Sequence, residues 1–104
     1  MAWKRTEDPT FADHCRRICA RYGVNYHDFD VVRDAIEENL EENPIAGSVP
    51  VTHALPEVRR FVFEPLPQHW DLPPLVVVLH ADPAGDEVFT LLEIWTEEEL
   101  DEQA

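Results

Sequence analysis

The chain has 104 residues, the usual size of one domain, and 44% of them are apolar, which is enough for one modest hydrophobic core. Its 22 acidic residues against eight basic ones give a net charge of −14 at pH 7. All eight basic residues lie in 1–60, while residues 61–104 hold 11 acids and neither Lys nor Arg. Because binding to phosphate backbones depends on Lys and Arg displacing counterions, we expect the C-terminal half to bind nucleic acid weakly.

The sequence shows neither a membrane-spanning pattern nor an export signal. Its longest apolar run, Leu75–Leu79, has the length of a strand, and no apolar stretch follows the charged residues near the N-terminus. We therefore expect a cytoplasmic protein with no membrane partner. Only one of the eight basic residues is Lys. This bias fits a GC-rich genome, and with the acid excess it also fits adaptation to high salt, where repulsion among carboxylates is screened.

The two cysteines, Cys15 and Cys19, stand four apart in a helical pattern. Thiols on adjacent helical turns rarely reach disulfide geometry, and a cytoplasmic protein keeps them reduced. A metal site there would need two further ligands, with His14 and His53 as the candidates. We interpret both thiols as small buried side chains, and we predict no metal or cofactor.

Two helices are predicted in the first half of the chain. The first, over 10–22, begins at Asp8-Pro9-Thr10 and ends at Gly23. The second, over 28–42, ends at Asn43-Pro44 because the residue before a proline resists the helical conformation. Their apolar stripes are Phe11, Cys15, Ile18 and Tyr22, and then Phe29, Val32, Ile36 and Leu40. The short link between the helices predicts an antiparallel hairpin.

Strands are predicted in the second half. Val58–Glu64 alternates, with Phe61 and Phe63 on one face. Leu75–Leu79 is apolar at every position, which is typical of a central strand covered on both faces. Val88–Trp95 should pair with it through the turn at 82–86, with Val88, Thr90, Leu92 and Ile94 on one face and Phe89, Leu91, Glu93 and Trp95 on the other.

These elements predict an α+β fold, in which an N-terminal helix hairpin packs on an antiparallel sheet of three or four strands. A short strand around Trp3–Thr6 would be an edge of that sheet. One domain is expected over 1–96, followed by an acidic C-terminal tail over 97–104. The tail would be either an exposed helical turn, because Thr96 and Glu99 match a capping box, or a disordered acidic end.

Three segments carry a resemblance to a known family. They are Glu42-Asn43-Pro44-Ile45-Ala46-Gly47, Val58-Arg59-Arg60-Phe61, and the run over 74–82 that leads into 88–94. In this order of elements the chain resembles the RelE/ParE toxin superfamily of type II toxin–antitoxin systems over most of its length. The resemblance implies ribosome-dependent mRNA cleavage or inhibition of DNA gyrase, restrained by a cognate antitoxin protein. Together with the acidic C-terminal half, this leads us to expect that nucleic acid is contacted weakly or only on the ribosome.

The resemblance implies a catalytic role for basic residues on the sheet, where Arg, Lys, Tyr or His orient the ribose hydroxyl and stabilise the phosphorane. The matching candidates here are Arg59, Arg60 and His80. The sequence departs from the family where Val76 and Leu79 replace an Arg and a Tyr, and where Trp95-Thr96-Glu97 replaces a basic pair. The toxin would then be catalytically degenerate, because cations aimed at the phosphate supply the largest catalytic contribution.

The alternative hypothesis is a non-enzymatic acidic module for protein interaction. Under this hypothesis, His80 is simply a side chain at the end of a strand. Arg16, Arg17 and Arg21 on the first helix are expected to pair with surrounding acids. The pair His69-Trp70 is either a recognition patch or a pin that holds its loop against the core.

Overall fold

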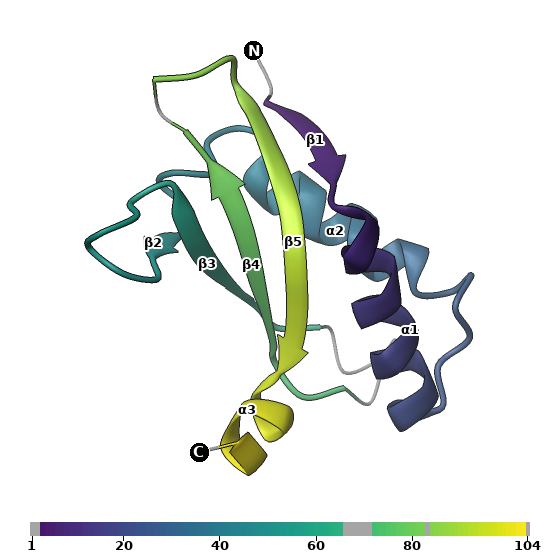
Figure 1. Cartoon of the computed structure of the whole chain (residues 1–104). Helices are drawn as coiled ribbons and strands as arrows, with labels where there is room; N and C mark the ends of the chain where they lie inside the picture. Colours follow the sequence, from purple (N-terminus) through teal and green to yellow (C-terminus); the bar gives the residue numbers. More distant parts are fainter. Residues whose placement is uncertain (1–2, 66–71, 83, 104) are drawn as a thin grey trace.

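The computed structural model describes residues 3–65, 72–82 and 84–103 as an α+β fold. In chain order its elements are β1 (Lys4–Glu7), α1 (Pro9–Tyr22), α2 (Asp30–Leu40), β2 (Val49–Pro50), β3 (Val58–Phe63), β4 (Leu75–Ala81), β5 (Val88–Thr96) and α3 (Glu97–Gln103). The strands form one sheet in the order β1-β5-β4-β3-β2 (Figure 1).

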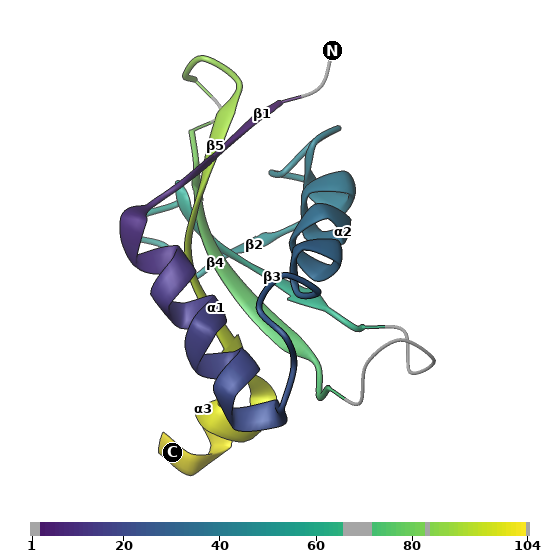
Figure 2. The same cartoon turned by 90° about the vertical axis from the view of Figure 1, so that its right-hand side faces the viewer.

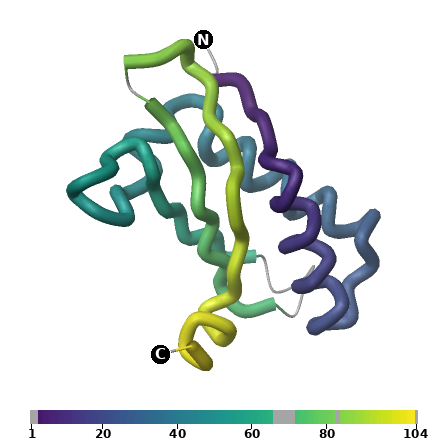
Figure 3. The backbone as a smooth tube through the Cα atoms, viewed as in Figure 1, coloured from purple at the N-terminus to yellow at the C-terminus, as the bar shows by residue number. Residues whose placement is uncertain are grey.

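The sheet differs from the predicted one in size and in strand direction. It has five strands, and the edge strand expected around Trp3–Thr6 is present as β1, ahead of the two helices. β1 runs parallel to β5, as the tube in Figure 3 shows, whereas the other pairs are antiparallel. The prediction of a purely antiparallel sheet was therefore wrong, because strand direction at an edge is set by the return path of the chain. The two-residue β2 is too short to give a periodic signal.

The first helix follows its predicted boundaries closely. The Asp8 side chain accepts a hydrogen bond from the N–H of Thr10 at 3.0 Å, and Pro9 is the first helical residue. Gly23 ends the helix at φ 67°, a left-handed conformation that glycine adopts without strain. α2 is shorter than predicted at both ends, since turns occupy 26–29 and a bend occupies 41–42. In Figure 2, α1 and α2 run in roughly opposite directions.

Both helices contribute to one core on the same face of the sheet. From β4 this covered face receives Leu75, Val77, Leu79 and Ala81, all fully buried. On the other face, which we call the open face, Val76 and Val78 are half-buried and His80 is exposed. β4 is central, as predicted, but the prediction that it is covered on both faces was wrong. Valine fits a strand whether or not its face is covered, so a run of valines does not report on burial.

A β-bulge in β5 changes which residues reach the core. Val78 lies opposite Glu93 but Leu79 lies opposite Leu91, so Leu92 is an extra residue in this strand. Ile94 is consequently buried on the same face as Phe89 and Leu91. The predicted alternation, which placed Ile94 on the opposite face from Phe89 and Leu91, was wrong because one added residue reverses the faces of all that follow.

The segment after β5 forms a helix, α3, which is the first of the two alternatives expected for the acidic tail. The N–H of Glu99 donates to Oγ1 of Thr96 at 3.1 Å, and the N–H of Thr96 donates to Oε1 of Glu99 at 2.9 Å. The predicted capping box is therefore confirmed. Thr96 is fully buried and Glu99 nearly so, which anchors α3 to the end of β5.

The two cysteines lie in the core, as predicted, and both are free thiols. Burial raises the pKa of Cys15 to about 12, so this thiol is unreactive at neutral pH. Within residues 3–65, 72–82 and 84–103, no three His, Cys, Asp or Glu side chains gather as a metal site. None of the helices in the same ranges is long and apolar enough to cross a membrane.

Candidate functional site

Most arginines are held by acids on the helix side of the molecule. The predicted pairing of Arg16, Arg17 and Arg21 is confirmed: their partners are Asp13, Glu99 and the pair Glu98 and Glu102. Arg5 reaches Glu37 at 3.0 Å, and Arg33 contacts Glu7 and Asp30. These five guanidinium groups thus serve contacts within the fold.

Arg17 holds α3 in place. Its Nε donates to Glu99 at 2.8 Å, its Nη2 donates to the carbonyl of Ile94 at 2.7 Å, and its guanidinium lies 4.4 Å from the ring centre of Trp95. Burial, the largest influence, acts to raise the pKa of Glu99. Hydrogen bonds from Arg17 and from the N–H of Thr96 together outweigh burial and hold that pKa below its ordinary value. Glu99 is therefore a carboxylate at neutral pH and fixes α3 against α1.

Arg59, the first of the predicted site residues, lies on the covered face and is buried. Its guanidinium donates to Oγ of Ser48 at 2.7 Å, to the carbonyl of Pro56 at 2.9 Å, and to the carbonyls of Ile45 and Ser48, both at 3.0 Å. The side chain of Ser48 in turn donates to the carbonyl of Pro44. Arg59 thereby clamps the loop between α2 and β2 to the sheet.

Arg60 and His80, the other two predicted site residues, lie together on the open face. Arg60 is opposite Val78 and His80 is opposite Val58, so the two side chains are diagonal neighbours on adjacent strands. Both are exposed, and neither makes a hydrogen bond or ion pair with another residue that the structure describes. The sheet thus brings two of the three candidates onto one face and turns Arg59 to the other.

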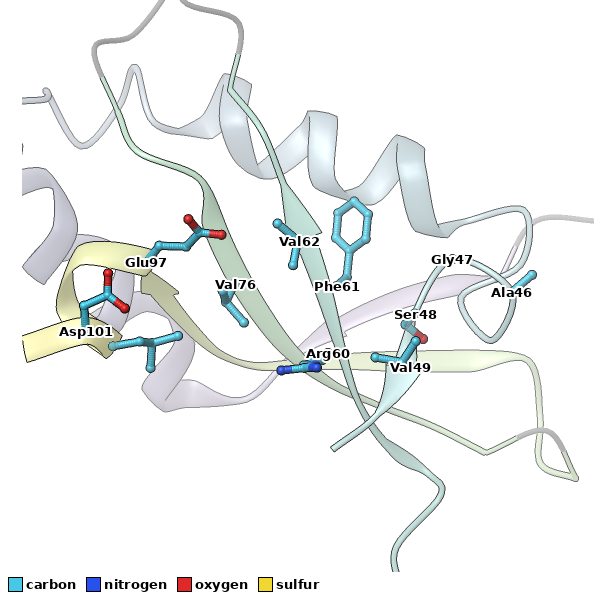
Figure 4. Close-up of a pocket in the computed structure, with 11 residues that line it drawn as sticks. Ala46, Gly47, Ser48, Val49, Arg60, Phe61, Val62, Val76, Glu97 and Asp101 are labelled. Atoms are coloured by element: carbon cyan, nitrogen blue, oxygen red, sulfur yellow. The ribbon is translucent and has the colours of Figure 1, made fainter. Parts of the chain in front are cut away.

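A groove of about 570 Å³ crosses the open face beside Arg60 (Figure 4). Val62 of β3 and Val76 of β4 form its apolar floor, and Leu100 of α3 stands at one side. The lining residues are Ala46, Gly47, Ser48, Val49, Arg60, Phe61, Val62, Val76, Glu97, Leu100 and Asp101. Figure 4 shows Glu97 and Asp101 at the end of the groove away from Gly47. The groove is therefore apolar along its floor and acidic at the α3 end.

Sequence reasoning missed the contribution of α3 to this groove. The sequence predicts an acidic tail at Glu97, Leu100 and Asp101, although its capping box indicates a helix that begins at the end of a strand. A second hollow of about 380 Å³ lies beside the outer edge of β3, lined by Asn39, Phe61, Val62, Phe63 and Glu64. The proposed recognition pair His69-Trp70 lies outside the described residues.

Comparison of the chain with family models, with curated proteins and with solved structures gives no match in any of the three.

Proposed function

We propose that this protein is a non-enzymatic interaction module that binds a partner protein in the groove on its open sheet face. The observation that carries the proposal is the composition of the groove. Val49, Val62 and Leu100 are exposed there, with 51%, 48% and 37% of their surface accessible. When apolar side chains of a partner cover such a patch, the free energy of the complex falls, because apolar surface is removed from water.

The acids at the α3 end select the partner. Glu98, Glu99 and Glu102 are engaged by arginines of α1, whereas Glu97 and Asp101 make no ion pair within the described chain. A partner that places Lys or Arg beside these two carboxylates gains charge complementarity, which favours correct pairing and fast association. The expected partner therefore presents apolar side chains together with basic ones.

The same surface is poorly suited to nucleic-acid chemistry. By strand alternation, the open face carries Arg60 and Lys4 as its Arg and Lys residues among those described, with His80 beside Arg60. Stabilising a pentacoordinate phosphate requires several cationic donors aimed at one oxygen cluster. A lone arginine near two carboxylates supplies little of that stabilisation.

A second candidate function follows from the placement of Arg60 and His80 on one face. As a RelE/ParE-like toxin, active or catalytically degenerate, the protein would be cytoplasmic, would be restrained by an antitoxin, and would contact mRNA only on the ribosome. Arg60 would then contact the phosphate and His80 would transfer the proton. The buried Arg59 would serve this role only indirectly, by holding its loop.

The interaction module is tested by site-specific photocrosslinking in cells of the source organism. A photoreactive amino acid replaces Val62 in the groove or, as a matched control, Val31, an exposed apolar residue of α2. We expect a discrete protein adduct from position 62 and none from position 31. Equal adducts from both positions, or none from 62, would contradict the proposal.

The toxin candidate is tested by growth on induction of the wild-type protein. The interaction module predicts no growth arrest. Arrest that disappears when Arg60→Ala and His80→Ala are combined, and that persists in Arg16→Ala, would favour the toxin. Circular dichroism of each variant must show an unchanged fold.

A further inference from the structure

The outer edge of β3 is only partly paired. β2 lies opposite Arg59 and Arg60, and it begins at Val49, opposite Arg60. From Phe61 onward, β3 has β4 on one side and, in the part of the chain that the structure describes, no strand on the other.

Backbone alternation shows which groups this edge presents. The N–H of Val51 donates to the carbonyl of Val58 at 3.0 Å, so Val58 turns its backbone groups toward β2. In an antiparallel ladder every second residue does the same, and Arg60 and Val62 follow. The N–H and C=O of Val62 therefore point outward, and none of the described backbone or side-chain groups bonds to them.

Two hollows flank this unpaired edge, one toward each face of the sheet. The groove on the open face begins at Val62, and the smaller hollow lies between the edge and Asn39 of α2. Figure 4 shows Phe61 pointing toward the helix, away from the groove floor. The side chains of an added strand alternate between the two faces, so successive residues would enter the two hollows in turn.

We propose that the partner binds by adding an extended segment to the edge of β3, opposite Val62 and Glu64, in line with β2. This inference rests on the proposed function and specifies how the partner binds. Main-chain hydrogen bonds with Val62 would set the register, while side chains in the two hollows would supply most of the affinity. The segment is short, because β3 itself ends at Phe63.

Charge and alternation identify a segment that turns Lys or Arg toward the open face, where the acids lie, and apolar residues toward the hollow beside Phe61 and Phe63. Glu64 lies at the edge, and Glu97 and Asp101 close the neighbouring groove. A second copy of this chain is a poor occupant, because each copy carries a net charge of −14 and would bring its own Glu64 to the contact.

The test uses a synthetic peptide of alternating valine and lysine at physiological salt. A peptide of the same composition with its lysines grouped in one block is the matched control. We expect the alternating peptide to slow hydrogen exchange at the amide of Val62, measured by NMR, by about tenfold or more, and the block peptide to leave it unchanged. The amide of Val31 on α2 should be unaffected by either peptide.

One protein variant and one modified peptide isolate the main-chain contact. Val62→Pro removes the outward N–H at an edge position that tolerates proline, and we expect about tenfold weaker peptide binding. If this variant fails to fold, an alternating peptide with N-methylated valines, tested on the wild-type protein, removes the same class of bonds from the other partner.

The outcomes separate this inference from the proposed function. Undiminished binding by both Val62→Pro and the N-methylated peptide would overturn strand addition, while crosslinking from position 62 would still support the interaction module. Absence of both peptide binding and crosslinking would overturn both. A dimer of the protein alone that Val62→Pro dissociates would also overturn the inference, because the occupant would be a second copy.

Discussion

The two faces of the sheet use neighbouring arginines in opposite ways. Arg59 and Arg60 are adjacent in β3, yet the first is buried and bonded to three carbonyls and a hydroxyl, while the second stands exposed beside a groove. Their chemistry is identical, so the difference comes from strand alternation alone. A basic residue on a strand therefore indicates a functional site only after its face is known.

The covered and open faces also differ in how their charges are compensated. On the helix side, Arg5, Arg17 and Arg33 each meet at least one carboxylate. On the open face, Arg60 and the groove acids Glu97 and Asp101 make no ion pair among the described residues. α3 contributes to both regions, because Glu99 faces Arg17 while Leu100 and its acidic neighbours line the groove.

The largest effect is expected from Arg59→Ala. The change removes four hydrogen bonds of a buried guanidinium and leaves the carbonyls of Ile45, Ser48 and Pro56 without that donor. We expect a loss of about 3–5 kcal/mol in the free energy of unfolding, measured by urea denaturation. Arg60→Ala is the matched control, with an expected change within about 0.5 kcal/mol. Equal effects would contradict the assignment of the two arginines to different faces.

An intermediate effect is expected from Glu99→Gln, which removes the charge that Arg17 binds. We expect a loss of about 1–2 kcal/mol in the free energy of unfolding. Protection factors for the amides of 97–103 should fall more than those of β4.

The same residue gives α3 a dependence on pH. The pKa of Glu99 is lowered from 4.5 by folding, so its stabilisation is complete above that value and is lost as the pH falls through the folded pKa. Hydrogen-exchange protection of α3 should therefore decline in acid in the wild-type protein, and this decline should be smaller in Glu99→Gln. An identical acid profile in the two proteins would show that another group anchors α3.

The smallest effect is expected from Val62→Thr on the open face. Because Val62 is already half-exposed, a hydroxyl there meets water, and the free energy of unfolding should change by no more than about 0.5 kcal/mol. Val77→Thr, on the neighbouring strand but fully buried, should cost about 2 kcal/mol, because its hydroxyl has no solvent to bond. Thermal unfolding of the two variants measures the difference between the faces directly.

Periodicity in the sequence predicted the helices and strands whose buried residues recur at regular helical or strand spacing. The stripe of Phe11, Cys15 and Ile18 gave α1, and the alternation of Phe61 and Phe63 gave β3. That same alternation places Arg59 with the two phenylalanines, so its covered position could have been derived from the sequence. The bulge at Leu92 could not, because it appears only when β5 pairs with β4.

The candidate groove could be predicted less well than the fold. Arg60 was found from its strand, but the wall formed by α3 depends on a contact between Arg17 and Glu99, which are 82 residues apart. Pairings at such separation leave no local pattern in a single sequence. The two-residue β2 begins only opposite Arg60, which leaves the edge of β3 unpaired from Phe61 onward, and so short a strand likewise leaves no periodic pattern in the sequence.

The parallel pairing of β1 with β5 has a consequence for how the chain reaches its native state. Oγ1 of Thr6 lies 2.7 Å from Oγ1 of Thr90, and these residues are 84 positions apart. During synthesis, β1 and the core face of α1 have no sheet to pack on until 88–96 has left the ribosome. Forming contacts between such distant residues costs a large loop-closure entropy. We therefore expect slow, late closure of the sheet rather than stepwise folding from the N-terminus. A nascent chain halted before β5 would expose the apolar stripe of α1, where chaperones would bind it.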